Sequence, residues 1–159
     1  MLAVYPGTFD PIHFGHLDVA RRAADIFAQV VVAVYDRPAK GILFSTEERV
    51  AMAAQAFAGL PNVEVASYQG LTVDYAVARR ARAIIRGLRA TSDFEFEFQL
   101  ALMNRHLTPR IEALFLMTSL EHAHLSSSLI KEVAQLGGHL HGLVPDHVAA
   151  ALHSKLGLS

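Results

Sequence analysis

Two histidines flank a glycine at the point where the first helical pattern of the chain begins. His13 and His16 enclose Gly15, and Thr8 and Asp10 precede them directly after an apolar run. Imidazole and hydroxyl groups donate hydrogen bonds to phosphate oxygens, and a helix N-terminus adds free N–H groups and a positive dipole end. Gly15 allows the backbone to approach a ligand closely. The segment therefore predicts a phosphate-binding site; the alternative is that Asp10 and His16 only cap the helix.

Three further segments place basic or hydroxyl side chains after apolar runs. Arg86 and Arg89 flank a Gly-Leu pair, and guanidinium groups bind phosphate oxygens in a bidentate manner. The serines at 126–128 begin another helical pattern, with Lys131 one turn later, and offer hydroxyl and N–H groups to an anion. The fourth segment, 37–40, is a basic loop.

Each of these segments also has a purely structural interpretation. Lys40 fits a solvated loop lysine, Arg86 fits an ion-pair partner of Asp93 or Glu95, and one of the three serines would suffice as an N-cap. No segment is decisive alone. Four such segments after four strands are a stronger indication, because a parallel sheet brings the ends of its strands together.

The apolar pattern alternates between short continuous runs and helical spacing. Continuous β-branched runs are typical of strands buried on both faces. The predicted strands are residues 2–5 (closed by Pro6-Gly7), 29–35, 62–67, 81–87 and 112–117. The predicted helices are residues 15–27, a helix from the Ser45–Glu48 capping box to about 58, about 72–80, 93–107, about 126–136, and a last helix with Pro145 in its first turn.

Residues 93–107 imitate a strand at first, because Phe94, Phe96 and Phe98 alternate with polar residues. The pattern then continues with helical spacing. Its two apolar faces are 94, 98, 102 on one side and 96, 100, 103 on the other. We expect one face to meet the sheet and the other to meet another subunit.

Alternation of strands and helices predicts an α/β fold: a single Rossmann-like domain with a five-stranded parallel sheet flanked by helices. The 159 residues, 52% of them hydrophobic, indicate one domain over 1–159 with a sizeable core. The GxGxxG and GxxxxGK[ST] patterns are absent, which excludes a dinucleotide-binding Rossmann protein and a P-loop NTPase.

Composition narrows the function further. A net charge of −1 argues against nucleic acid or an anionic membrane as a partner, and the lack of cysteine excludes thiol chemistry. The nine histidines are scattered, which disfavours a metal site built from them. Since neither a signal peptide nor an apolar stretch long enough for a membrane span is apparent, we expect a cytoplasmic protein.

These motifs resemble a known family. The chain resembles the superfamily of nucleotidyltransferases with the HxGH motif in three segments: Tyr5-Pro-Gly-Thr-Phe-Asp-Pro, His13-x-Gly-His16 and Ser126-Ser-Ser-x-Ile-Lys131. Within that superfamily it resembles the phosphopantetheine adenylyltransferases in three further segments: Ile85-Arg-Gly-Leu-Arg-Ala90, Asp93-Phe-Glu-x-Glu97 and Met103-Asn-Arg-His106. The resemblance extends over about residues 3–156.

The resemblance implies transfer of AMP from ATP to 4′-phosphopantetheine, giving dephospho-coenzyme A and pyrophosphate, with Mg²⁺ as cofactor and a homohexamer as the assembly. It places phosphopantetheine on Thr8, Lys40, Thr72 and Arg86. It places ATP on Thr8, Phe9, His16, Gly87, Leu88, Arg89, Glu97, His122, Ala123, His124, Leu125, Ser126, Ser127 and Ser128. The residues expected to act in catalysis are His16, Lys40 and Arg89.

The implied reaction suits a chain without an obvious nucleophile–base pair. The attacking phosphate oxygen is already anionic at neutral pH, so the reaction needs neither a general base nor a covalent intermediate. We expect His16 and Lys40 to stabilise the transferring phosphoryl group, and Arg89, Ser127 and Ser128 to hold the outer phosphates. The rival interpretations are a sibling enzyme that adenylylates nicotinamide mononucleotide or transfers CMP, and a non-catalytic sensor of nucleotides or coenzyme A.

Overall fold

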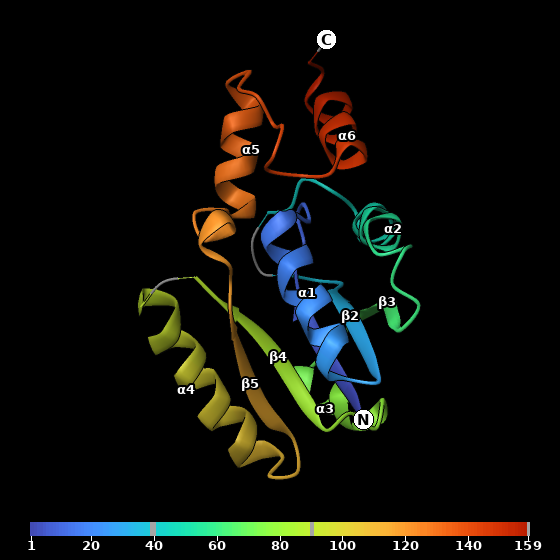
Figure 1. Cartoon of the computed structure of the whole chain (residues 1–159), viewed down its shortest axis with the longest axis vertical. Helices are drawn as coiled ribbons and strands as arrows, with labels where there is room; N and C mark the ends of the chain where they lie inside the picture. Colours follow the sequence, from blue (N-terminus) through green and yellow to red (C-terminus); the bar gives the residue numbers. More distant parts are fainter. Residues whose placement is uncertain (39–40, 90, 159) are drawn as a thin grey trace.

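The computed structural model describes residues 1–38, 41–89 and 91–158. As predicted, five strands form one parallel sheet. Their order in the sheet is β3-β2-β1-β4-β5 (Figure 1). The strands are β1 (Leu2–Gly7), β2 (Gln29–Tyr35), β3 (Val63–Tyr68), β4 (Ala83–Leu88) and β5 (Glu112–Met117).

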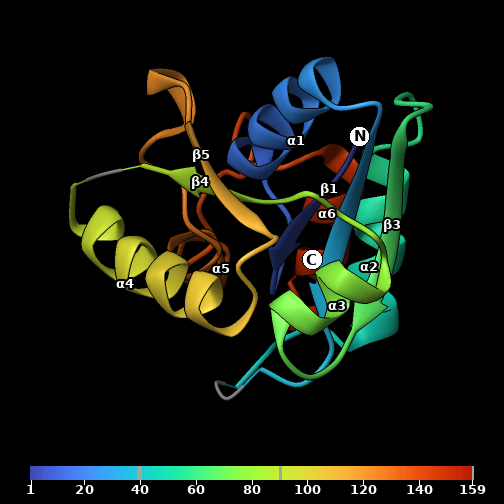
Figure 2. The same ribbon diagram turned by 90° about the horizontal axis from the view of Figure 1, so that it is seen from below.

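Helices cover both faces of this sheet. They are α1 (Phe14–Ile26), α2 (Thr46–Ala56), α3 (Thr72–Ala78), α4 (Thr91–Leu107), α5 (Ser127–Gln135) and α6 (Asp146–Leu156), with a short 3₁₀ turn η1 (Leu120–His122) that the sequence pattern did not indicate. Helices α1 and α2 lie on one face, and α3 and α4 on the other (Figure 2). Helices α5 and α6 pack against each other beyond the carboxyl ends of the strands.

The core is divided by the sheet into two layers. Val30, Val32 and Val34 of β2 face the larger layer under α1 and α2, whereas Val31 and Ala33 face the layer under α3. All five side chains are fully buried. A strand covered on both faces must be apolar at every position, which is why β2 appears in the sequence as a continuous β-branched run.

The sheet opens between β1 and β4. Strand β1 pairs with β2 as far as Gly7, opposite Val34, but pairs with β4 only at Ala3 and Val4. The prediction that Pro6-Gly7 closes the first strand was therefore wrong: the strand continues through both residues beside β2. Proline lacks an N–H, and the carbonyl oxygen of Pro6 accepts a hydrogen bond from Arg86 at 3.3 Å instead of completing a ladder with β4.

Two local predictions about helix starts can be compared with the structure. The Ser45–Glu48 capping box of α2 is confirmed, with both reciprocal hydrogen bonds present. Pro145 is the N-cap of α6 and not its first-turn residue, because its ψ of 152° is still extended. The strand-like alternation around Phe96 was correctly assigned to a helix, α4.

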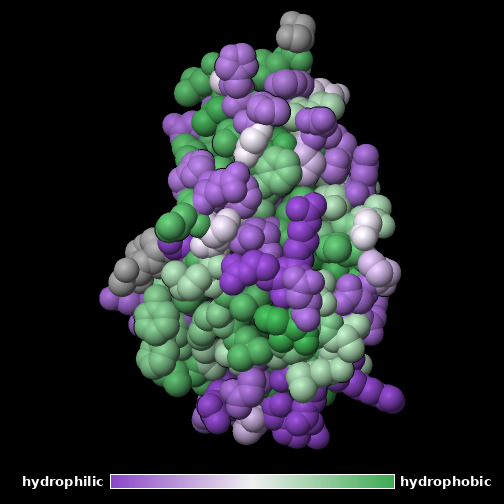
Figure 3. Space-filling model, viewed as in Figure 1, coloured by the Kyte–Doolittle hydropathy of each residue, from purple (hydrophilic) through white to green (hydrophobic). Residues whose placement is uncertain are grey.

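Helix α4 packs on β4 and β5, but many of its apolar side chains stay exposed. The ring of Phe94 contacts Phe115 of β5, at 6.3 Å between centroids. The exposed apolar residues of α4 are Phe94, Phe96, Phe98, Leu102, Met103 and Leu107, and Leu114 and Met117 add to them on β5. Figure 3 shows hydrophobic residues gathered over this part of the surface.

Among the described residues, no helix is both long and apolar enough to cross a membrane.

Candidate active site

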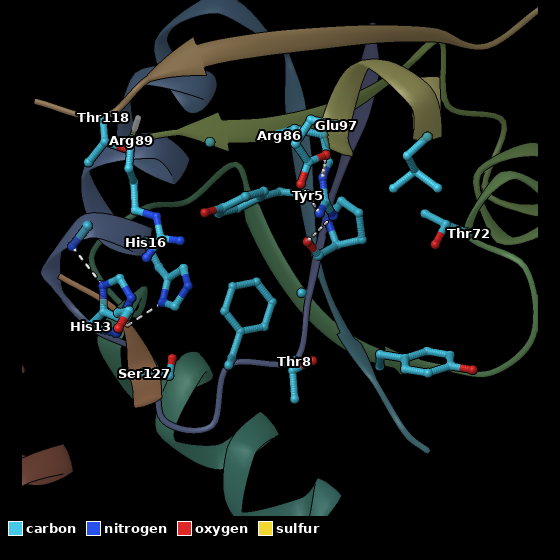
Figure 4. A pocket seen from close by; sticks show the side chains of 18 of the residues that line it. Tyr5, Thr8, His13, His16, Thr72, Arg86, Arg89, Glu97, Thr118 and Ser127 are labelled. Carbon is cyan, nitrogen blue, oxygen red and sulfur yellow. Dashed lines mark hydrogen bonds and ion pairs between the residues drawn. The ribbon is translucent and has the colours of Figure 1, made fainter. Parts of the chain in front are cut away.

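A pocket of about 620 Å³ lies at the carboxyl ends of the strands, where the sheet opens between β1 and β4. Open α/β sheets bind their ligands at this position. The predicted site residues that line the pocket are Thr8, Phe9, His16, Thr72, Arg86, Gly87, Arg89, Glu97, Ser126, Ser127 and Ser128. Figure 4 shows His16 and Arg89 close together on one side of the pocket, and Thr72 on the other.

The two histidines of the HxGH motif stack on each other at the start of α1. Their ring centroids are 3.6 Å apart, with 25° between the ring planes. His13 is the N-cap of α1, and its Nδ1 accepts from the N–H of Gly15 at 3.1 Å. The backbone N–H of His13 in turn donates to Nδ1 of His16 at 3.2 Å. The capping alternative therefore holds for His16, which both caps the helix and lines the pocket.

Both imidazoles are neutral at physiological pH. Burial, with the charge of Arg89 and the neighbouring His122, lowers the pKa of His13 to about 3. Burial also lowers the pKa of His16 well below its usual value, with help from His13 and Arg89. Since Nδ1 of His16 accepts a hydrogen bond, the single proton of the neutral ring is on Nε2. His16 therefore offers the pocket an N–H donor without a positive charge.

Aromatic rings hold His16 from behind. The ring of Phe9 meets His16 edge-on at 4.9 Å and Tyr5 edge-on at 5.6 Å, and both Phe9 and Tyr5 are buried. Phe9 takes a left-handed backbone conformation with φ of 51°. A Cβ at Gly7 would lie 2.8 Å from the Phe9 ring, so glycine there is needed for this packing.

Arg89 links the end of β4 to the segment before α5. Its guanidinium donates to the carbonyl oxygen of Leu125 at 2.9 Å. Gly87 lies between Arg89 and Arg86, and a Cβ there would approach Val19 of α1 to 3.1 Å. A larger residue at Gly87 would therefore require the side chain of Val19 in α1 to shift.

Arg86 and Arg89 have different protein partners in the structure. Arg86 points to α4, where it makes two hydrogen bonds of 2.6 Å to the carboxylate of Glu97. Burial alone would lower the pKa of Arg86, but the hydrogen bonds and charge of Glu97 outweigh it and raise the pKa. The alternative that Arg86 has an acidic partner is correct, but the partner that the structure describes is Glu97 and not Glu95, because α4 turns Glu97 toward β4. The side chain of Asp93, the other expected partner, lies outside the described part of the chain.

The three serines at the start of α5 have different environments. Ser126 is the N-cap, accepting from the N–H of Leu129 at 3.2 Å, and Ser127 donates to the carbonyl oxygen of Pro11 at 2.8 Å. Ser128 is exposed and lines the pocket. The helix N-terminus therefore faces the pocket with free N–H groups and at least one available hydroxyl.

Asp10 does not cap α1. The alternative that both Asp10 and His16 cap this helix is therefore wrong for Asp10. Its carboxylate accepts from the N–H groups of Leu43 and Phe44, both at 2.9 Å, and forms an ion pair with Lys131 of α5 at 2.6 Å. Lys131, which follows the three serines by one turn, is thus ion-paired with a buried carboxylate that joins three segments around the pocket.

Tyrosines form the other side of the pocket and were missed in the sequence. Tyr35 and Tyr68 are the last residues of β2 and β3, and their rings lie 5.3 Å apart. The hydroxyl of Tyr68 is 2.9 Å from that of Thr72, and burial raises the pKa of Tyr68. Their position at the carboxyl ends of strands was the signal that could have found them. Asn104 of α4 and Thr118 also line this pocket.

Some predicted residues lie outside the lining of the pocket. These are Leu88, His122, Ala123, His124 and Leu125. Leu88 and Leu125 are buried, and the His122 ring stacks near Phe14 with centroids 6.0 Å apart. Their contact with ATP stays a prediction. Lys40 lies outside the described residues, so its predicted role is not addressed by the structure.

The described residues do not form a resident metal centre. No group of three or more His, Asp or Glu side chains is gathered among them in a manner that suits an ion. Two acidic residues of this region, Glu97 in the pocket lining and Asp10 in the loop after β1, are ion-paired with Arg86 and Lys131. Hydroxyl groups and N–H donors dominate this pocket, which suits phosphate oxygens and not a bare cation.

Fold and site together define a nucleotidyltransferase of the cytidylyltransferase-like family, whose family model matches residues 4–133. Within this class the chain belongs to the phosphopantetheine adenylyltransferase family, because curated proteins of that name are similar to it over nearly their whole length. The one from Thermomicrobium roseum is 58% identical over 156 residues, which are 96% of this chain and 93% of the relative. The one from Synechococcus elongatus is 54% identical, covering 98% and 93%. That from Caldanaerobacter subterraneus is 51% identical, covering 97% and 96%.

Proposed function

We propose that residues 1–159 act as one nucleotidyltransferase domain that transfers AMP from ATP to 4′-phosphopantetheine, forming dephospho-coenzyme A and pyrophosphate. The observation that carries the proposal is the arrangement of donors in one pocket. His16, Arg89 and the N-terminus of α5 supply phosphate-binding groups on one side, and Arg86 and Thr72 line the other (Figure 4). Tyr68 also lines the pocket there, with its hydroxyl 2.9 Å from that of Thr72. Family membership supports the same reaction.

In this proposal ATP occupies the side of His16 and Arg89. The Nε2–H group of His16 donates to a non-bridging oxygen of the α-phosphoryl group, where charge increases in the transition state. Arg89 and the start of α5, with Ser128, hold the β- and γ-phosphates that leave as pyrophosphate. Lys40 assists at the transferring phosphoryl group.

The acceptor occupies the side of Thr72 and Tyr68, with its phosphate toward Thr8, Lys40 and Arg86. Its phosphate oxygen is the nucleophile and is already anionic, so no residue has to remove a proton. Catalysis then depends on alignment of this oxygen with the α-phosphorus and on the donors that face the developing charge. The neutrality of His16 agrees with a role as donor and not as general acid.

Mg²⁺ is proposed to arrive with ATP. The ion keeps several waters and commonly binds through substrate phosphates, so it does not need a cluster of protein carboxylates. When bound, it would neutralise charge on the phosphates.

We also propose that copies of the chain associate through the exposed apolar residues of α4 and β5, as a hexamer by resemblance. Eight large apolar side chains are exposed on these two elements, and contiguous apolar surface of this kind is typical of an interface. Neither nucleic acid nor a membrane is a proposed partner, and the cytoplasm is the proposed location.

The decisive experiment is pyrophosphate release from ATP and Mg²⁺ with 4′-phosphopantetheine, nicotinamide mononucleotide or glycerol 3-phosphate as the acceptor. We expect release with phosphopantetheine alone. Release only with another acceptor would replace the proposed substrate by that of a sibling enzyme. ATP binding without release for any of the three would favour the non-catalytic sensor.

A further inference from the structure

An arginine that lies behind the pocket is completely buried. Arg49 is in the first turns of α2 and has 0% of its surface exposed, although it follows Glu47 and Glu48 in a segment that looks solvent-facing in the sequence. Arginine is rarely buried fully unless its charge and donors are compensated. The hydrogen-bond acceptors of the Arg49 guanidinium therefore indicate its role in the structure.

All five N–H donors of Arg49 have acceptors. Nε donates to the carbonyl oxygen of Phe44 at 3.2 Å. One terminal nitrogen donates to the carbonyl oxygens of Thr8 and Tyr35, both at 2.8 Å. The other donates to the carbonyl oxygen of Asp36 at 3.3 Å and to the hydroxyl of Thr46 at 2.9 Å.

These acceptors are four backbone carbonyls and one hydroxyl, so Arg49 binds the backbone of separate segments and not a carboxylate partner. Burial lowers the pKa of Arg49, with Asp10 and Asp36 acting in the opposite direction. An arginine keeps its charge because its ordinary pKa is above 12. Only the planar guanidinium has five donors in a fixed fork, whereas the lysine ammonium has three.

Two of the four carbonyls belong to residues of the pocket wall, Thr8 after β1 and Tyr35 at the end of β2. The other two, at Asp36 and Phe44, lie on either side of the loop between β2 and α2. Asp10 binds the same connection through the N–H groups of Leu43 and Phe44. Arg49 therefore joins the loop after β1 to the β2–α2 connection at the place where the acceptor side of the pocket begins.

We propose that Arg49 is a positioning residue for the transfer reaction: its guanidinium sets the distance between the Thr8 backbone and the end of β2, and thereby the alignment of the acceptor phosphate. The inference rests on the proposed function, because it assumes that Thr8 and the Tyr35 side receive the acceptor. Arg49 touches neither substrate. It acts through the residues that do.

The test compares Arg49→Lys and Thr46→Val with Asn62→Ala. Arg49→Lys keeps the charge but loses at least two of five hydrogen bonds. The nearly isosteric Thr46→Val removes one acceptor of Arg49 and, with it, the hydrogen bonds that the Thr46 hydroxyl donates to Asp36. Asn62→Ala is the matched control, since Asn62 also donates to two carbonyls, Ala24 and Phe27, at the opposite end of the sheet. Steady-state kcat and both KM values are measured at a temperature where each variant is folded by circular dichroism.

We expect Arg49→Lys to raise KM for phosphopantetheine and lower kcat, together on the order of a hundredfold in kcat/KM, because small misplacements of reacting groups have effects of that size. Thr46→Val should also raise KM for phosphopantetheine and lower kcat, but by a smaller factor than Arg49→Lys. In Asn62→Ala, KM for both substrates should stay at the wild-type value. The same pattern of KM values in Arg49→Lys and Asn62→Ala would overturn the proposal, because it would mean that Arg49 contributes stability alone.

Amide hydrogen exchange tests the role of Arg49 without an activity measurement. The N–H groups of Asp36 and Phe44 donate to Tyr68 and Asp10 and report on the loop that Arg49 holds. We expect Arg49→Lys to speed exchange at these amides more than in the rest of the chain. Uniformly faster exchange would reject the positioning role. Failure of the proposed function is recognised separately, as absence of pyrophosphate release by the wild-type protein.

Discussion

His16 is held from three directions before any ligand binds. The N–H of His13 donates to its Nδ1, the ring of His13 stacks on it, and the ring of Phe9 meets it edge-on. These contacts leave Nε2–H as the group available to the pocket. A donor whose orientation is set in advance does not need to reorganise during the reaction, which is the main advantage of such sites.

Replacement of His16 should separate its two roles. We expect His16→Ala to lower kcat about a hundredfold, roughly 3 kcal/mol, because a preorganised donor to the α-phosphoryl group is lost. It should also lose about 1 kcal/mol of stability with the cap. His16→Asn is the control, since its short side chain can still accept from the N–H of His13 but has no group at the position of Nε2. Equal and near wild-type kcat in both variants would show that His16 only caps the helix.

Helix α4 is joined to the sheet by a charged contact as much as by apolar packing. Glu97 is a buried acidic residue of this helix, and it holds Arg86 of β4 with two hydrogen bonds while several phenylalanines nearby are exposed. The contact also places a residue expected on the ATP side beside one expected on the acceptor side. A change in α4 should therefore reach both halves of the pocket.

Glu97→Gln tests this connection. Loss of one partner of a buried ion pair costs about 3–5 kcal/mol, and the 26% exposure of the Arg86 side chain reduces the expected destabilisation to about 2 kcal/mol. The measurement is urea unfolding. The control, Glu95→Gln on the exposed side of the same helix, should change stability by less than about 0.5 kcal/mol. Similar values for the two variants would mean that the pair contributes little to the position of α4.

Acid stability is a property of the whole molecule to which the HxGH motif contributes. The pKa of His13 is about 3 in the folded protein, against an ordinary value of 6.5. Between these values the unfolded chain binds more protons than the folded one. The contribution of His13 to the free energy of unfolding is therefore fully present above about pH 6.5 and is lost as the pH is lowered. His16 acts in the same direction.

We therefore expect the free energy of unfolding to fall below pH 6.5 by about 1.4 kcal/mol per pH unit for each of the two histidines. Urea unfolding at pH 7, 6 and 5 measures it. His13→Asn retains a good N-cap and should remove about half of this slope. His153→Gln, at an exposed position, should leave the slope unchanged. A slope that does not respond to His13→Asn would contradict a neutral, buried imidazole.

Assembly is the second property at this scale. We expect Phe96→Glu or Met103→Glu to dissociate the proposed oligomer, because a charge in a covered apolar face is desolvated without a partner. Light scattering after gel filtration measures the mass against 17.3 kDa for one chain. Leu136→Glu is the control: this residue is also apolar and exposed, but it lies at the far end of α5. A wild-type protein with the mass of a single chain would reject the proposal.

The sequence by itself determined the elements and the edge of the sheet at which the site lies. The bounds predicted for 29–35 and 112–117 are those of β2 and β5, and the Ser45–Glu48 box begins α2. Such features depend on neighbours within a few residues, or on burial on both faces, and both leave a regular pattern in the chain. The position of polar segments after strands then follows from a parallel sheet.

Only the tertiary structure decided which side chains meet. The pairs Arg86–Glu97 and Asp10–Lys131 join elements whose distance depends on how α4 and α5 pack, and no local pattern encodes that packing. Arg49 resembles a surface arginine in the sequence, because four of its five acceptors are backbone carbonyls, which leave no trace in residue types. Tyr35 and Tyr68 end their strands in the sequence, but only the structure shows that both line the same pocket.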